Sequence, residues 1–231
     1  MPTAKLMQQT ALNLIAIGVF GMTLSTLLGP MFNISPAIPA VTTLGVLSLA
    51  TLDSFRFQGK GATLLLDWLA GTRSEHRDRI VRHEAGHFLV AYFLGIPITG
   101  YTLTAWEALK QGQPGLGGVI FDSQNLSPEA FKVREMRLTL ERFCTVWMAG
   151  IAAENLVYGS AEGGIEDRQK LREALASMGL VNSEFQLKER WATRQAQTII
   201  EEHWASYEAL VVAMEQRASV TECCQVIQQH T

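Results

Sequence analysis

The chain has 231 residues, with 19 Lys and Arg against 22 Asp and Glu and a formal net charge of −3 at pH 7. Charged residues make up 18% of the sequence, below the roughly 25% of an average soluble domain, and hydrophobic residues make up 48%. This composition excludes an intrinsically disordered chain, which would be poor in apolar residues and rich in charge. The balanced charge argues against a nucleic-acid partner, because a nucleic-acid-binding protein carries a basic face.

Charge is missing from one long stretch near the N-terminus, since no charged residue lies between Lys5 and Asp53. Two apolar blocks, 11–28 and 37–52, fill this stretch on either side of a turn rich in proline. A membrane-spanning helix needs about 20 mostly apolar residues, with about 17 as a minimum. We therefore predict a transmembrane helical hairpin. A secretory signal peptide and a buried pair of soluble helices are the alternatives.

The remainder of the chain carries the patterns of a mainly α-helical domain with a small β-ribbon. Two domains follow from this division, a membrane anchor over residues 1–60 and a soluble domain over residues 61–231. The few cations that flank the apolar blocks favour a soluble domain on the cytoplasmic side, or on its stromal or matrix equivalent. Helices are predicted over 74–94, 129–140, 142–158, 166–178, 183–217 and 221–229, strands over 98–106 and 119–121, and a short apolar segment over 62–69.

The sequence His83-Glu84-Ala85-Gly86-His87 fits the pattern HExxH inside the first of these soluble helices. Residues four apart lie on one face of a helix, so both imidazoles can bind one Zn²⁺ ion. The glutamate between them can act as a general base toward a water molecule. His83 and His87 are therefore candidate zinc ligands, and Glu84 is the candidate catalytic residue.

A catalytic zinc site needs a third protein ligand and one open position. Downstream carboxylates are the candidates, because no further histidine follows His87 at the spacing of extended zinc motifs. Asp167 and Glu166 stand at the start of a predicted helix, and Glu154 lies on the helix before it. The residue types alone leave these three alternatives open.

Several segments together resemble the FtsH-type family of zinc metallopeptidases. The sequence RHEAGHFLVAYFLG resembles the catalytic helix of that family, and LGGVIF (116–121) resembles the segment after its β-ribbon. MAGIAAENLVYG (148–159) resembles a glycine-rich helix with paired acidic residues, the second of which is Asn155 here. GGIEDRQKLREA (163–174) resembles the segment that carries the third zinc ligand of the family, an aspartate, and the alignment places Asp167 at that ligand.

The resemblance covers roughly residues 74–215 and implies a membrane-anchored zinc metalloendopeptidase. Its substrates would be unfolded or membrane-associated polypeptides, and the family implies a homo-oligomer or an association with an AAA+ protease. Two features depart from the family. No ATP-binding loop of the form GxxxxGK[ST] occurs, so the chain itself is expected to act without ATP. Arg168 stands where an apolar residue is usual.

Two other functions fit the sequence less well. The chain could be a non-proteolytic membrane scaffold or a subunit of a larger protease complex, but such a role gives no physical need for Glu84. A zinc hydrolase of small molecules fits the pentapeptide but not the wider resemblance. The three cysteines (Cys144, Cys223 and Cys224) cannot form a disulfide framework with several bridges, and they favour a reducing compartment.

Overall fold

The computed structural model describes residues 2–33, 35, 37–56, 74–111, 118–121, 133–180 and 182–231. The chain divides into two compact units, Met1–Thr72 and Arg73–Thr231. The apolar segment predicted over 62–69 lies outside the described residues, as does the predicted helix start at 129–132.

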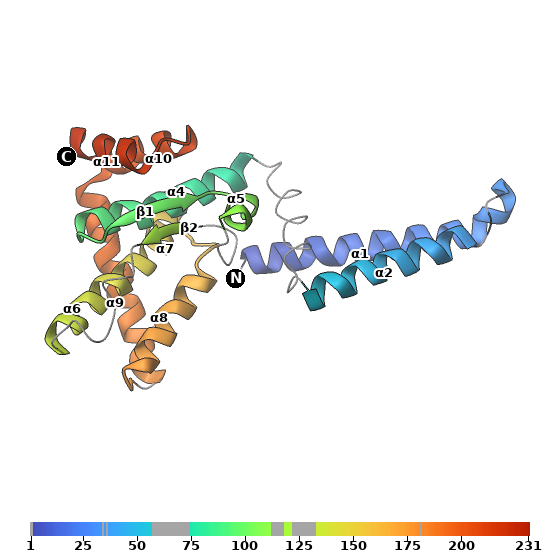
Figure 1. The fold of residues 1–231 in the computed structure, drawn as a ribbon, viewed down its shortest axis with the longest axis horizontal. Helices are drawn as coiled ribbons and strands as arrows, with labels where there is room; N and C mark the ends of the chain where they lie inside the picture. The colour runs from blue at the N-terminus through green and yellow to red at the C-terminus, as the bar shows by residue number, and fades with distance from the viewer. Residues whose placement is uncertain are drawn as a thin grey trace. The chain divides into compact units, whose positions relative to one another are not determined.

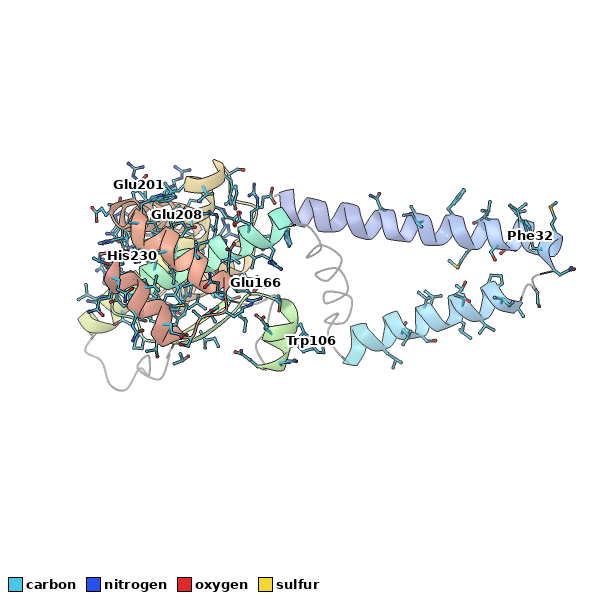
Figure 2. All side chains as sticks on the ribbon, turned by 90° about the horizontal axis from the view of Figure 1, so that it is seen from above. Phe32, Trp106, Glu166, Glu201, Glu208 and His230 are labelled. Atoms are coloured by element: carbon cyan, nitrogen blue, oxygen red, sulfur yellow. The ribbon has the colours of Figure 1, made fainter. Side chains whose placement is uncertain are left out.

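The first unit contains two long helices, α1 (Pro2–Leu28) and α2 (Ala37–Arg56), with the short 3-10 helix η1 (Gly29–Phe32) after α1. They run in opposite directions, and Phe32 lies at the end of the pair where the chain reverses (Figures 1 and 2). The predicted helices over 11–28 and 37–52 coincide with parts of these elements, but α1 begins earlier, at Pro2, and α2 ends later, at Arg56. Among the helices that the structure describes, however, none combines the length and the apolar character needed to cross a membrane. The predicted transmembrane hairpin is therefore not supported.

Most of the described side chains of α1 and α2 are apolar and exposed. The hydroxyls of four threonines, which would otherwise require water, donate hydrogen bonds to carbonyl oxygens four residues earlier in the same helix (Thr23, Thr26, Thr42 and Thr43). The exposed large apolar side chains are Ile17, Val19, Phe20, Leu24, Leu27, Leu28, Met31, Phe32, Ile38, Val41, Leu44, Val46, Leu47, Leu49 and Leu52. So many exposed apolar side chains are unusual for a monomer in water. They indicate contact with an apolar partner or with an apolar phase such as lipid.

The second unit is mainly helical and contains one small sheet, which confirms that part of the prediction (Figure 1). The antiparallel strands β1 and β2 pair Tyr101 with Val119 and Thr102 with Gly118. The elements are α4 (Ser74–Phe93), β1 (Ile98–Thr102), α5 (Ala105–Lys110), β2 (Gly118–Phe121), α6 (Val133–Trp147), α7 (Ala149–Tyr158), α8 (Ile165–Ser177), α9 (Asn182–Glu202), α10 (Trp204–Glu215) and α11 (Val220–Gln229).

The predicted strand over 98–106 is too long, because β1 ends at Thr102 and the helix α5 follows. The hydroxyl of Thr104 accepts a hydrogen bond from the backbone N–H of Glu107, and the Glu107 carboxylate accepts one from the N–H of Leu103. These two bonds satisfy donors that would otherwise be free at a helix start. The spacing Thr-x-x-Glu in the sequence is typical of such a helix start. Trp106 on α5 is exposed (Figure 2).

Two predicted helix boundaries are also wrong. The break placed between 140 and 142 lies at Met148, between α6 and α7. The single helix predicted over 183–217 is divided at His203, which leaves helical geometry with φ −119° and ψ 37°. The imidazole of His203 stacks on Phe93 with ring centroids 3.7 Å apart. After this break α10 packs against α4. The Tyr207 hydroxyl on α10 donates a hydrogen bond to the carbonyl of Arg82 on α4.

The helix that carries the HExxH sequence lies in the centre of the core. Ala85, Phe88 and Leu89 on α4 are fully buried. Its closest neighbour is α7, because a Cβ atom at Gly86 would lie 2.7 Å from the carbonyl oxygen of Ala149 and 2.8 Å from the Cβ of Ala153. The two helix backbones can approach this closely only with glycine at position 86.

We predict that Gly86→Ala lowers the free energy of unfolding by about 1–3 kcal/mol, because the added methyl group overpacks the contact with α7. The gain of about 1 kcal/mol in helix propensity offsets only part of this cost. Urea unfolding of the full chain, followed by tryptophan fluorescence, measures the change. The second substitution Ala153→Gly removes one of the two clashes and should restore part of the loss. An equally stable Gly86→Ala variant would contradict the close crossing.

Candidate metal centre

The side chains of His83, Glu84 and His87 form a group on α4 that could hold a metal ion. All three are at least nine-tenths buried, with exposed fractions of 8%, 9% and 5%. The two imidazoles lie on the same face of the helix, with ring centroids 4.8 Å apart. The helical spacing predicted from the sequence is therefore present.

Asp167 lies on another helix, α8, and its carboxylate contacts both histidines. Its Oδ2 atom lies 3.2 Å from Nε2 of His83 and 3.4 Å from Nε2 of His87. Bonds of about 2.1 Å at tetrahedral angles separate neighbouring zinc ligands by about 3.4 Å. The two distances from Oδ2 are therefore those between neighbouring ligands of a tetrahedral zinc site, and two nitrogens with one carboxylate oxygen are ligands that zinc accepts.

The start of α8 is shaped so that Asp167 can reach the histidines. Gly164, the residue before the helix, has a left-handed backbone with φ +85°, and a Cβ atom there would lie 2.3 Å from Ile151. Gly163 contacts the site itself, since its Cβ would lie 2.8 Å from Oε1 of Glu154 and 3.1 Å from the ring of His83. The glycine pair therefore allows this loop to pack against the site.

Glu154 on α7 lies behind His83 rather than among the three facing atoms. Its Oε1 atom is 2.7 Å from Nδ1 of His83, while Nε2 of the same ring faces Asp167. The Glu154 carboxylate also accepts hydrogen bonds from the backbone N–H groups of Glu162 and Gly163 and from the guanidinium of Arg79. Glu154 therefore orients the first histidine. The third alternative, Glu166, is exposed on α8 (Figure 2).

His87 is oriented by the backbone of α6. Its Nδ1 atom lies 2.7 Å from the carbonyl oxygen of Val146, which accepts the proton on that nitrogen. This bond leaves the lone pair of Nε2 directed at the group. Gly150 on α7 makes room for the other ring, because a Cβ there would lie 2.3 Å from Nε2 of His83. Nothing in the sequence indicates the roles of Val146 and Gly150, because a backbone carbonyl and a steric gap leave no motif.

In the metal-free protein the His83 ring carries a proton on each nitrogen. Burial alone would lower the pKa of His83, but hydrogen bonds to Asp167 and Glu154 outweigh it and raise the pKa to about 10. For the Asp167 carboxyl, burial is opposed by His87 and His83, whose contacts hold its pKa well below the usual range. The negative carboxylate and the positive ring thus stabilise each other in the absence of a metal ion.

Glu84 lies beside the ligand group with its carboxylate held by the sheet. Its Oε2 atom accepts a hydrogen bond of 3.1 Å from the backbone N–H of Val119 on β2. Burial raises the pKa of the Glu84 carboxyl, and the nearby histidines oppose that shift. A raised pKa brings a carboxylate closer to the range in which a general base both accepts and returns a proton near neutral pH.

No protein-family model matches this chain, and no curated protein is significantly similar to it. The resemblance to FtsH-type metallopeptidases therefore depends on the segments quoted above and on the arrangement of the residues they contain.

We predict that Glu154→Gln weakens the binding of Zn²⁺ by about 10–100-fold, because the neutral amide supports His83 less well than a carboxylate does. Competition with a metal-binding dye measures the affinity of the full chain. Glu166→Gln is the matched control, since this exposed neighbour of Asp167 contacts neither histidine. A Glu154→Gln protein that folds normally and binds zinc within twofold of the original chain would contradict the orienting role.

Metal binding should also release protons in a defined range of pH. The pKa of His83 in the folded, metal-free protein is raised from 6.5 to about 10, so the ring is protonated at pH 7.5. A metal ion must displace the proton on Nε2, and its affinity should rise about tenfold per pH unit up to that pKa. Titration calorimetry in buffers of different ionisation enthalpy should detect at least one proton released per Zn²⁺ at pH 7.5. Binding without proton release would show that His83 is neutral.

Proposed function

We propose that the chain is a zinc metalloendopeptidase of the FtsH type. One observation carries the proposal. The two histidines of HExxH meet Asp167 at the spacing of tetrahedral ligands, and Glu84 stands beside them. In this proposal His83, His87 and Asp167 hold a Zn²⁺ ion with one position open to solvent or substrate. The extended resemblance over roughly residues 74–215 supports the same assignment.

Bound zinc would polarise the scissile carbonyl and lower the pKa of a water molecule. The protein supplies the proton transfers. Glu84 accepts a proton from the attacking water, and the N–H of Val119 keeps its carboxylate at the site while it does so. The same carboxyl then returns the proton to the amine of the leaving peptide. Glu154 and the Val146 carbonyl keep the two imidazoles in place through these steps.

The proposed substrates are polypeptides that are already unfolded or associated with a membrane. The chain has no ATP-binding loop of the kind that drives unfolding, so cleavage itself needs no ATP. A stably folded substrate would require a separate motor, and a homo-oligomer or an AAA+ protease partner would supply the assembly in which such a motor acts.

We also propose that the N-terminal helix pair attaches the chain to a lipid membrane, with the peptidase domain on the cytoplasmic side or its stromal or matrix equivalent. The observation in favour is the large exposed apolar surface of α1 and α2. Their threonine hydroxyls are satisfied within the helices, so contact with lipid leaves these donors paired.

We predict that Glu84→Gln abolishes the cleavage of an unstructured protein such as casein while zinc binding is retained. The amide cannot accept the proton of the attacking water, and the loss should exceed 100-fold. Glu166→Gln again serves as the exposed control. A Glu84→Gln protein that cleaves as fast as the original chain would sink the proposed mechanism. Full biological function of that variant would favour the non-proteolytic scaffold instead.

We predict that the full chain floats with phospholipid vesicles in a density gradient. Replacement of three exposed α2 residues (Val41, Leu44 and Leu47) by Asn should reduce the floating fraction, because it removes apolar surface available to lipid. Replacement of the exposed Leu138 and Leu187 in the second unit by Asn is the matched control and should leave flotation unchanged. A soluble, folded chain that stays at the bottom of the gradient would contradict membrane attachment.

A further inference from the structure

Arg79, Arg168 and Lys170 are cations of the described residues that lie near the metal centre, and the first two are held by carboxylates of the surrounding frame. Arg79 pairs with Glu154 and Glu162, on the Nδ1 side of the His83 ring, away from Asp167. Arg168 turns from the site to Glu189 on α9, at 2.8 Å. Both side chains are tied to structural partners, and neither faces the Nε2 atoms.

Lys170 differs from these two residues in its position and in its exposure. It lies one helical turn after Asp167 on α8, and its Nζ atom is 3.7 Å from Oδ1 of Asp167. That oxygen is the one that does not face the histidines, whose Nε2 atoms both approach Oδ2. The Lys170 side chain is 56% exposed, whereas the side chain of Asp167 is only 12% exposed. Lys170 thus places a positive charge at the exposed edge of the site, beside Asp167.

The charge balance of the centre gives this lysine a chemical task. A divalent ion with the carboxylates of Asp167 and Glu84 and two neutral imidazoles has a net charge near zero. When Glu84 takes the proton of the attacking water, its negative charge passes to the carbonyl oxygen of the substrate, so the total charge is unchanged but an anion forms at a new position. Preorganised positive groups at the place where such charge develops commonly supply a rate factor of 10²–10³.

We infer that Lys170 is a catalytic residue whose ammonium group stabilises the oxyanion formed from the scissile carbonyl, an inference that rests on the proposed peptidase function. In the first step Glu84 takes a proton from water, the water oxygen bonds to the carbonyl carbon, and the π electron pair moves to the carbonyl oxygen beside Lys170. In the second step the C=O bond re-forms, the C–N bond breaks, and Glu84 protonates the departing amine. Lys170 keeps its proton throughout.

Substitution by methionine tests this role, because it keeps the length of the side chain and removes its charge. We expect Lys170→Met to lower kcat for an unstructured peptide by about 10–100-fold with KM within threefold, and Lys170→Arg to restore most of the activity. Arg172→Met is the matched control, an exposed cation on the same helix two residues further on, and it should leave both constants unchanged.

A binding measurement supplies a readout that does not depend on turnover. A phosphonate peptide carries a tetrahedral anionic group like the oxyanion, whereas the amide peptide of the same sequence does not. We expect Lys170→Met to lower the affinity for the phosphonate peptide by about 10–100-fold, as measured by titration calorimetry. Binding of the amide, measured in the Glu84→Gln background to prevent cleavage, should stay within threefold.

Three results would overturn the assignment while leaving the proposed function intact. The first is an unchanged kcat and phosphonate affinity. The second is a loss of activity that parallels a loss of zinc affinity, which would show that Lys170 only positions Asp167. The third is a rise in KM confined to peptides with acidic side chains, which would make Lys170 a specificity residue. A zinc-loaded original chain that cleaves no unstructured polypeptide would instead overturn the peptidase function, and the role of Lys170 with it.

Discussion

The candidate metal centre depends on the close crossing of α4 and α7. Gly86 allows the two backbones to approach, and on the other helix Gly150 leaves space for the ring of His83. One turn beyond Gly150, the same helix presents Glu154 to Nδ1 of that ring. A wider crossing would separate His83 from its carboxylate support and disturb its position relative to Asp167. The small residues within and around HEAGH therefore determine the ligand geometry as directly as the histidines do.

Burial makes the electrostatics of this centre demanding. Isolated charges are costly to remove from water, so buried carboxylates and imidazoles must pair with one another or with a metal ion. Glu154 meets this requirement with four donors, and Asp167 meets it with the two imidazoles and Lys170. Without metal, a proton on His83 supplies the missing positive charge. In the proposed metal-bound form, a divalent cation would replace that proton within the same frame of carboxylates and imidazoles.

The sequence predicts the parts of the site that repeat along one helix, and it misses those that depend on contacts between helices. His83, Glu84 and His87 follow from helical spacing alone, whereas Glu154 stayed an alternative ligand because no local pattern places α7 against α4. The break at His203 was missed for a similar reason. No glycine or proline marks this break in the sequence. It coincides with the stacking of His203 on Phe93 of α4, a contact between distant parts of the chain. The short helix α5 was missed although its Thr-x-x-Glu capping spacing was readable.

The surroundings of Glu84 are costly for a side chain that has no chemical role. Its carboxylate is buried beside another carboxylate, and burial raises its pKa. A scaffold that needed only the fold would gain stability from an apolar or amide side chain there, because leaving a buried acid in such surroundings is costly. The backbone N–H of Val119 compensates only one oxygen of the acid. A buried acid with a raised pKa, held beside two imidazoles, therefore has the properties of a proton acceptor, which is the role proposed for Glu84.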